Sequence, residues 1–216
     1  MLIEHENTFK QALLEGVNLF LGAGFSTLAK DVNGRNIPLG GTLKEELLES
    51  FGKTDLRDLS LPQICAVLEA EGKDEFYSYL NKRFSVGGYS EKYHALDKIA
   101  INTIFTTNID DLLYKIFSDS KEHYLNDVVL RGPSFRDKVA IDLVTLHGSI
   151  AHEGESLVFS TLDLATAFTT DPDKWHFLTQ RIQALPTLFW GYSLARLYPF
   201  GHFLALFGQV DPVYAV

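Results

Sequence analysis

Four short apolar runs in this 216-residue chain are each followed by small or polar residues, and this pattern constrains the fold more than any other feature. The runs are "VNLFL" before Gly22, "NTIFTT" before Asn108, "IDLVTL" before His147 and "TLFW" before Gly191. Helical patterns separate them, and apolar strands that alternate with helices are typical of a parallel sheet covered on both faces. We therefore expect an α/β fold with a doubly wound, mainly parallel, Rossmann-like sheet.

The pattern changes between the first and the second run. Residues 39–100 carry four successive helical segments, namely "TLKEELLESF" with Thr42 as its cap, "SLPQICAVLEAEG", "KDEFYSYLNKRF" and "SEKYHALDKIA". We expect a single domain over residues 1–216 with an all-helical lobe inserted between the first two core strands. Cys65 lies in one of these apolar helical runs, which predicts a buried structural thiol.

The remaining patterns predict smaller elements. A helix is expected over residues 5–15 and a strand near "DVVL", residues 127–130. The predicted elements of the last third are a short strand in "SLVFS", a helix capped at Thr161, a helix around "KWHFLTQRIQ" and a buried helix over Leu194–Phe207.

Composition excludes several classes of protein. Hydrophobic residues make up 46% and charged residues 22%, which is typical of a folded domain. The net charge of -9 argues against direct nucleic-acid binding, which needs clustered Lys and Arg. No run approaches the length of a membrane span and the first residues lack a signal-peptide pattern, so we expect a cytoplasmic protein. A single cysteine excludes an internal disulfide and a multi-cysteine zinc site.

The glycines after the first run form a candidate ligand-binding turn. Ligands of open parallel sheets lie beyond the carboxyl ends of the strands, where Gly22, Ala23 and Gly24 stand. Such a turn can bring backbone N–H groups to a phosphate, and the Ser26 and Thr27 hydroxyls could bond it or cap the next helix. Thr27 occupies the place of the third glycine of the common dinucleotide motif, so a plain tight turn is the alternative.

The other strand ends supply further candidates. Because carboxyl ends of parallel strands share one edge of a sheet, polar residues after them should converge above the glycine turn. These residues are Asn108, Asp110, His147, Ser149, Gly191 and Ser193. The alternatives are structural: the Asn and Asp could cap the helix "DDLLYKIF", and the others could be turn residues. His147 and His152 show no third ligand nearby, so no metal site is expected.

The segments "GAGFS", "TTNID" and "LHGS", in this order and with a lobe between the first two, resemble the sirtuin family. The resemblance spans residues 17–193 and implies a sheet of the sirtuin and deoxyhypusine-synthase type, with NAD as the substrate. It implies that Asn108 and Asp110 surround the nicotinamide ribose and that His147 is the catalytic base. The NAD contacts implied by the resemblance and the strand ends are Gly22, Ala23, Gly24, Ser26, Thr27, Asn108, Asp110, Gly148, Gly191 and Ser193.

The chain also departs from sirtuin deacylases. Their zinc ribbon needs four cysteines, and their first-loop motif has only a partial counterpart in Ile37 and Pro38. The chain is thus more similar to the zinc-free sirtuin-like NAD hydrolases of bacterial anti-phage systems, which cause abortive infection by NAD depletion.

This resemblance implies cleavage of NAD to nicotinamide and ADP-ribose without zinc. It implies a homo-oligomer, or a partner or fused sensor such as a helicase-like ATPase, an Argonaute-type protein or a phage-protein receptor. The apolar end "FGQVDPVYAV" is the sequence's hint of an interface. Two alternatives stay open: a non-catalytic sensor of NAD or ADP-ribose, and an NAD-dependent protein deacylase or ADP-ribosyltransferase.

Overall fold

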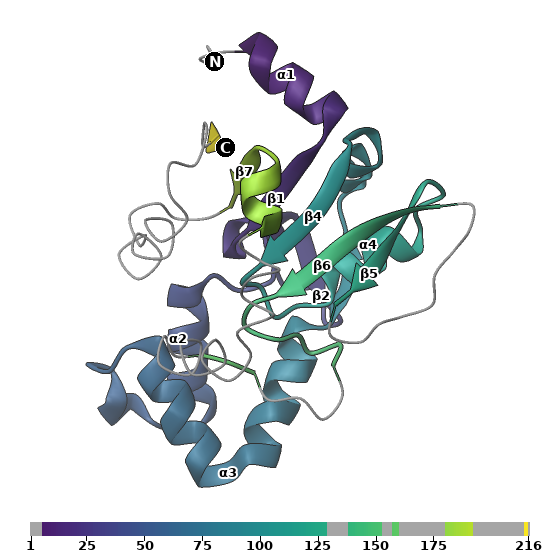
Figure 1. The fold of residues 1–216 in the computed structure, drawn as a ribbon. Helices are drawn as coiled ribbons and strands as arrows, with labels where there is room; N and C mark the ends of the chain where they lie inside the picture. The colour runs from purple at the N-terminus through teal and green to yellow at the C-terminus, as the bar shows by residue number, and fades with distance from the viewer. Residues whose placement is uncertain (1–5, 129–137, 153–156, 160–179, 192–213, 216) are drawn as a thin grey trace.

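The computed structural model describes residues 6–128, 138–152, 157–159, 180–191 and 214–215. Within them a parallel sheet has the strand order β5-β6-β4-β1-β7-β8 (Figure 1). The strands are β1 (Val17–Leu21), β4 (Ile101–Thr106), β5 (His123–Asp127), β6 (Val139–Thr145), β7 (Thr187–Trp190) and the two-residue β8 (Tyr214–Ala215). The expected α/β fold with a mainly parallel, Rossmann-like sheet is confirmed.

Helices connect the strands of this sheet. Helix α1 (Glu6–Glu15) leads into β1, and α4 (Leu112–Ser118) lies between β4 and β5 in the chain and packs against β5. Residues 180–184 are helical and precede β7. The strand order places β4, β6 and β5 on one side of β1 and β7 on the other, so the winding direction reverses at β1. In open α/β sheets, ligands bind at such a reversal.

The carboxyl ends of the four central strands lie in one row. Leu21, the last residue of β1, pairs with Thr106 of β4 and with Trp190 of β7. Thr106 in turn pairs with Thr145, the last residue of β6. The residues that follow these four ends therefore leave the sheet at the same edge, as the strand pattern predicts.

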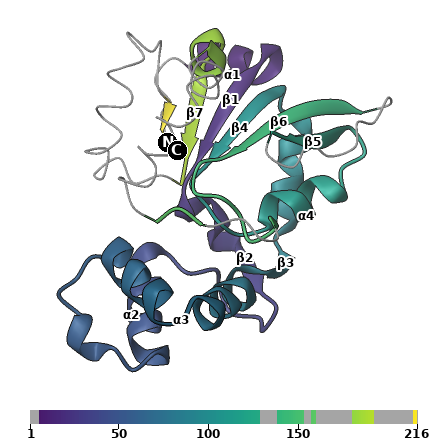
Figure 2. The ribbon, with the colours of Figure 1, turned by 60° about the horizontal axis from the view of Figure 1, so that its bottom comes forward.

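The segment inserted between β1 and β4 lies beyond this edge (Figure 2). Its helices α2 (Gly40–Ser50) and α3 (Leu61–Phe84) are accompanied by the 3-10 turns η1 (Ala23–Leu28), η2 (Thr54–Leu56) and η3 (Glu91–Lys98). The insertion is not all-helical as expected, because β2 (Ala29–Asp31) and β3 (Val86–Tyr89) form an antiparallel pair. Gly87 permits this pairing: a Cβ there would lie 2.8 Å from the Asp31 carbonyl oxygen.

Helix boundaries in the insertion differ from the prediction at several points. Helix α2 begins at Gly40 with Leu39 as its N-cap, so Thr42 lies in the first turn and does not cap it. The two helices predicted between residues 60 and 84 are confirmed: α3 is two helical segments joined at a kink, where Gly72 has a non-helical conformation (φ −166°, ψ 78°). Residues 91–98 form a 3-10 helix, whose N-cap Ser90 accepts a hydrogen bond from the Lys92 N–H.

Two strand predictions were also wrong in position or kind. The strand expected near residues 127–130 is β5, which ends at Asp127. Residues 157–159, part of the run expected as a strand, have no regular secondary structure, although the Val158 N–H donates to the His147 carbonyl. The helices predicted after Thr161 and over Leu194–Phe207 lie outside the described residues.

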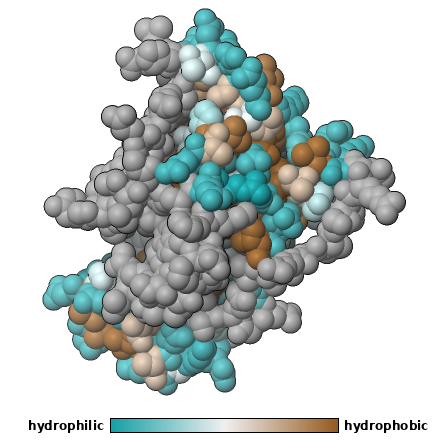
Figure 3. All heavy atoms as spheres, viewed as in Figure 1, coloured by the Kyte–Doolittle hydropathy of each residue, from teal (hydrophilic) through white to brown (hydrophobic). Residues whose placement is uncertain are grey.

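The core joins the sheet to the insertion. Apolar side chains of β1, β4 and β6 pack into one cluster with those of α2 and α3, and Cys65 belongs to it. Burial raises the pKa of the Cys65 thiol to about 12, which agrees with the expected structural role. On the face in Figure 3, the hydrophobic residues that are coloured stand in small groups among hydrophilic ones. No helix in the described ranges is long and apolar enough to cross a membrane.

Candidate functional site

A cavity of about 190 Å³ opens where the aligned strand ends meet the insertion. Ala23, Asn108 and His147 each stand two residues beyond the last residue of β1, β4 and β6, respectively, and all three line it. The other lining residues are Ile37, Pro38, Gly40, Leu43, Leu61, Pro62, Phe84, Thr107, Ile109, Asp110 and Phe159. The alignment of the strands thus gathers side chains that are far apart in the sequence.

The hydroxyl of Ser26 links Asn108 to Asp110. Its Oγ donates to Asp110 Oδ2 at 2.7 Å and accepts from Asn108 Nδ2 at 2.9 Å. Asn108 Nδ2 also donates to the Gly22 carbonyl at 3.1 Å, which fixes the orientation of the amide because a carbonyl can only accept. The amide oxygen of Asn108 makes no hydrogen bond to the described residues. Ser26 therefore bonds these two side chains and caps no helix here.

Asp110 is a buried carboxylate. It is 8% exposed, and burial raises its pKa to about 6 even though the Ser26 hydroxyl and the Leu112 N–H stabilise the charged form. Helix α4 starts at Leu112, so the Asp110 carboxylate bonds the first N–H of the helix and also lines the cavity. The carboxylate thus makes the contact at the helix start that the structural interpretation predicts, and its role towards a ligand stays a prediction.

A backbone contact fixes the tautomer of His147. Its Nδ1 lies 2.5 Å from the Val158 carbonyl oxygen. Because that oxygen can only accept, Nδ1 carries a proton and Nε2 is the basic atom of the neutral ring. Burial lowers the pKa of His147 although the Val158 bond opposes this effect. The imidazole is therefore neutral at neutral pH, as a general base requires.

The glycine turn after β1 is bonded to the end of β7. The Gly22 N–H donates to the Trp190 carbonyl at 3.0 Å and the Gly24 N–H to the Gly191 carbonyl at 2.8 Å. Gly191 has φ +69°, and a Cβ there would lie 2.0 Å from the Phe25 nitrogen. Packing of the two segments accounts for these glycines, and the N–H groups of Gly22 and Gly24 are used within the protein. Their contact with a nucleotide stays a prediction.

Several predicted site residues are placed away from the cavity lining. Thr27 Oγ1 donates to the Gly24 carbonyl, and Ser149 Oγ donates to the Ile109 carbonyl. Gly148 has φ +77°, which favours glycine in the turn after β6. Ser193 lies outside the described residues. Contacts of these four residues with a ligand stay predictions.

Seven of the residues that line the cavity form an apolar group that the sequence did not indicate. We define this apolar wall as Ile37, Pro38, Leu43, Leu61, Pro62, Phe84 and Phe159. They come from the loop after β2, from α2, from α3 and from residues 157–159, so no local motif could group them. Of the seven, only the first two were noted in the sequence, as a partial counterpart of a sirtuin loop.

His152 is buried and links three elements of the fold. His152 Nε2 lies 2.9 Å from Asp127 Oδ2 and 2.9 Å from the Tyr114 hydroxyl, which also bonds Asp127. This arrangement ties the segment after β6 to β5 and α4. Within the described part of the chain, no cluster of His, Cys, Asp or Glu is arranged to hold a metal ion.

A comparison with models of known protein families found a match. Residues 102–196 match the model of a family described as SIR2-like domain. The matched region runs from β4 past β7 and contains Asn108, Asp110 and His147. No curated protein matches the chain.

Proposed function

We propose that this chain, whose residues 102–196 match the SIR2-like domain family, hydrolyses NAD to nicotinamide and ADP-ribose. One observation carries the proposal: Asn108, Asp110 and His147 leave two adjacent strand ends and line the same cavity. A carboxylate can stabilise a cationic ribose carbon, a neutral imidazole can take a proton from water, and an amide can orient the sugar or the water, and all three actions assist hydrolysis of an N-glycosidic bond. The family match supports the use of NAD in general, and this constellation supports its cleavage.

The shape and polarity of the cavity fit one part of a dinucleotide. Pockets for whole drug-sized ligands measure about 300–1,000 Å³, larger than the 190 Å³ found here. A flat aromatic ring with its ribose suits this size. In our proposal the nicotinamide lies against the apolar wall and the ribose faces Asn108 and Asp110.

The charges suit bond cleavage with a neutral leaving group. In NAD the C1′–N bond breaks with its electron pair moving to nicotinamide, and the ribose carbon becomes oxocarbenium-like. The Asp110 carboxylate would stabilise that positive charge, and it acts strongly because it is buried. Ser26 holds the carboxylate in place, and the Asn108 amide oxygen can accept a hydrogen bond from a ribose hydroxyl or from water.

His147 would supply the base. As the water oxygen bonds to the ribose carbon, a proton passes to Nε2, while Nδ1 keeps its hydrogen bond to the Val158 carbonyl. General-base assistance of this kind typically contributes about 10²-fold to 10⁴-fold to the rate. The remaining predicted contacts belong to the same proposal, with the turn at Gly22, Ala23 and Gly24 nearest the phosphates.

We further propose that the chain depletes NAD in the cytoplasm as the effector of an anti-phage defence system. The support is the sequence resemblance to zinc-free sirtuin-like hydrolases and the lack of a four-cysteine set. Such an enzyme would damage its own cell unless restrained, so oligomerisation or a sensor partner would control it.

Two other functions would use the same site. A sensor would hold NAD or ADP-ribose without turnover, and a deacylase or ADP-ribosyltransferase would pass a group between NAD and a protein. Prolonged incubation separates them: an unchanged cofactor indicates a sensor, and mass transfer to a protein indicates the third function.

A cellular experiment tests the proposal. The native chain, Asn108→Ala and His147→Ala are expressed with the neighbouring partner gene, and total NAD is measured. We expect total NAD to fall in the culture that expresses the native chain and to stay unchanged in the cultures that express the two variants. Equal NAD levels in the three cultures would contradict the proposed hydrolase function.

A further inference from the structure

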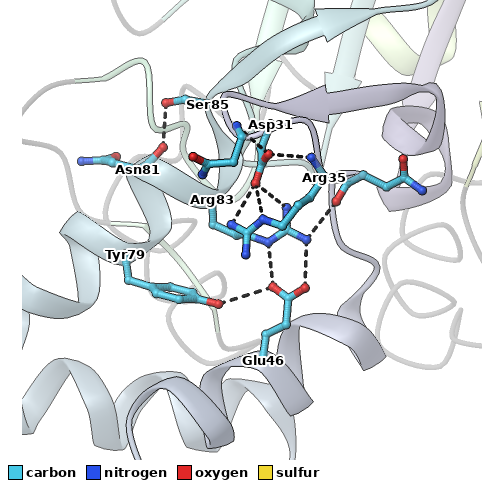
Figure 4. A network of polar contacts seen from close by, with 9 residues as sticks. Asp31, Arg35, Glu46, Tyr79, Asn81, Arg83 and Ser85 are labelled. Atoms are coloured by element: carbon cyan, nitrogen blue, oxygen red, sulfur yellow. Dashed lines mark hydrogen bonds and ion pairs between the residues drawn. The ribbon is translucent and has the colours of Figure 1, made fainter.

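Arg83, near the end of α3, is the centre of a buried polar network (Figure 4). It is 3% exposed, and its guanidinium makes two hydrogen bonds to Glu46, from Nε at 2.6 Å and from Nη2 at 2.9 Å. Nη1 donates to Asp31 Oδ2 at 3.2 Å, and Nη2 also donates to the Asn36 carbonyl at 2.8 Å. The Arg83 side chain thus bonds β2, the loop after β2 and α2.

Arg83 and two of its partners, Asn36 and Glu46, lie close to apolar-wall residues in the sequence. Asn36 directly precedes Ile37 and Pro38, and Arg83 directly precedes Phe84. Glu46 lies three residues after Leu43 in α2, which is one turn away and on the same face. The guanidinium therefore joins the segments that present four of the seven wall residues.

The loop between β2 and α2 is closed around the same carboxylate. Asp31 Oδ1 accepts from the N–H groups of Asn33 and Arg35 at 2.9 Å each, and Oδ2 accepts from Arg35 Nε. Although burial opposes ionisation, these bonds hold the pKa of Asp31 below its usual value. The carboxylate is thus charged at neutral pH and holds the loop by its backbone.

We propose that Arg83 is a positioning residue that sets the shape of the apolar wall by fixing the loop after β2 to α2 and α3. A planar fork with five donors is needed to reach two carboxylates and a carbonyl together, which a lysine ammonium cannot do. The consequence for NAD rests on the proposed function: the wall would pack against the face of the nicotinamide ring, and this contact is the same before and after the C1′–N bond breaks, so Arg83 acts on substrate binding.

The structural part is tested without a ligand. Hydrogen–deuterium exchange is followed over residues 36–43 of the full chain for the native protein, Arg83→Lys and the matched control Arg35→Lys. Arg35 bonds the same carboxylate, but its side chain is 53% exposed and, among the described residues, it donates no hydrogen bond to Glu46 or to the Asn36 carbonyl. We expect exchange about tenfold faster in Arg83→Lys and little changed in the control. Native-like exchange in Arg83→Lys would overturn the proposal.

The functional part uses the split between KM and kcat. Loss of uniform binding raises KM and leaves kcat unchanged, so we expect KM for NAD to rise about tenfold and kcat to stay within about threefold. A fall in kcat equal to the fall in kcat/KM would overturn the role in binding.

All variants are assayed under conditions in which circular dichroism shows them to be folded. Glu46→Gln, which keeps the pair of Asp31 and Arg83, replaces Arg83→Lys if that variant does not fold. If the native chain cleaves no NAD, the proposed function fails, whereas the exchange result still decides the inference.

Discussion

The Ser26 hydroxyl donates a hydrogen bond of 2.7 Å to Asp110 Oδ2, and both residues are buried. The bond crosses from the turn after β1 to the segment after β4. It therefore fixes the carboxylate from the neighbouring strand end. The adjacent hydroxyl of Thr27 is exposed and bonds only its own turn, at the Gly24 carbonyl.

Ser26→Ala should destabilise the protein and reduce activity. It removes a buried donor and leaves an Asp110 oxygen and an Asn108 N–H without their partner, which costs about 1–3 kcal/mol. Urea denaturation measures the loss of stability and nicotinamide release measures activity. Thr27→Ala is the matched control, and it should change the stability by less than about 0.5 kcal/mol. Equal effects of the two substitutions would contradict the bridging role.

Asp110→Asn should make the protein more stable and less active at neutral pH. The folded-state pKa of about 6 lies above the usual value of 3.8, so the folded protein retains this proton to higher pH. As the pH rises from about 4 to 6, ionisation of Asp110 therefore lowers the free energy of unfolding, and above about pH 6 this loss stays constant. We expect a gain of about 1–3 kcal/mol for the variant at pH 7.5, shrinking towards pH 4. Denaturation across this range checks it, and a variant less stable than the native protein at pH 7.5 would contradict it.

The pH dependence of activity should show a loss on the acid side. Hydrolysis needs neutral His147, whose pKa is lowered by burial, and ionised Asp110, whose pKa is raised to about 6. The value of kcat/KM should fall below about pH 6 and be level from about pH 7 to 8, because both groups are then deprotonated. A profile of kcat/KM measures this. Activity that rises steadily as the pH falls below 6 would be incompatible with the assigned roles.

Gly191→Ala should disrupt the site from outside the cavity. A side chain would meet the Phe25 backbone, and the left-handed conformation itself costs about 1–2 kcal/mol for other residues. We expect a lower melting temperature and a weakened glycine turn with reduced activity. Gly41→Ala is a suitable control, since a Cβ there meets nothing within 4 Å in α2 and alanine favours helix. A Gly191→Ala protein as stable as the native one would contradict the account of the turn.

The sheet and its functional edge could be predicted because their causes are local. Apolar runs of strand length ending at Gly22, Asn108, His147 and Gly191 predicted parallel strands with converging ends, and the structure has them aligned. The link through Ser26 could not be predicted, because it depends on how the turn after β1 faces the segment after β4. A hydroxyl near a glycine turn is as compatible with a helix cap as with this bond.

The insertion was harder to predict for the same physical reason. Its strands β2 and β3 are short, lie far apart in the sequence and are held by pairing with each other, so periodicity over either segment alone is weak. The apolar wall draws on four segments, and its residues look like ordinary core positions. Arg83 lies in a helical pattern, where a charged residue predicts a face exposed to solvent. In the structure its two carboxylate partners stabilise it inside the protein.

Release of nicotinamide by the purified full chain tests the central claim most directly. Native protein and His147→Asn, whose amide can keep the donor to the Val158 carbonyl, are incubated with NAD, alone and with the activating partner, and nicotinamide is quantified. We predict release by the native protein and a rate about 10²-fold to 10⁴-fold lower for the variant. No release by the native chain in either condition, or equal release by the two proteins, would contradict it.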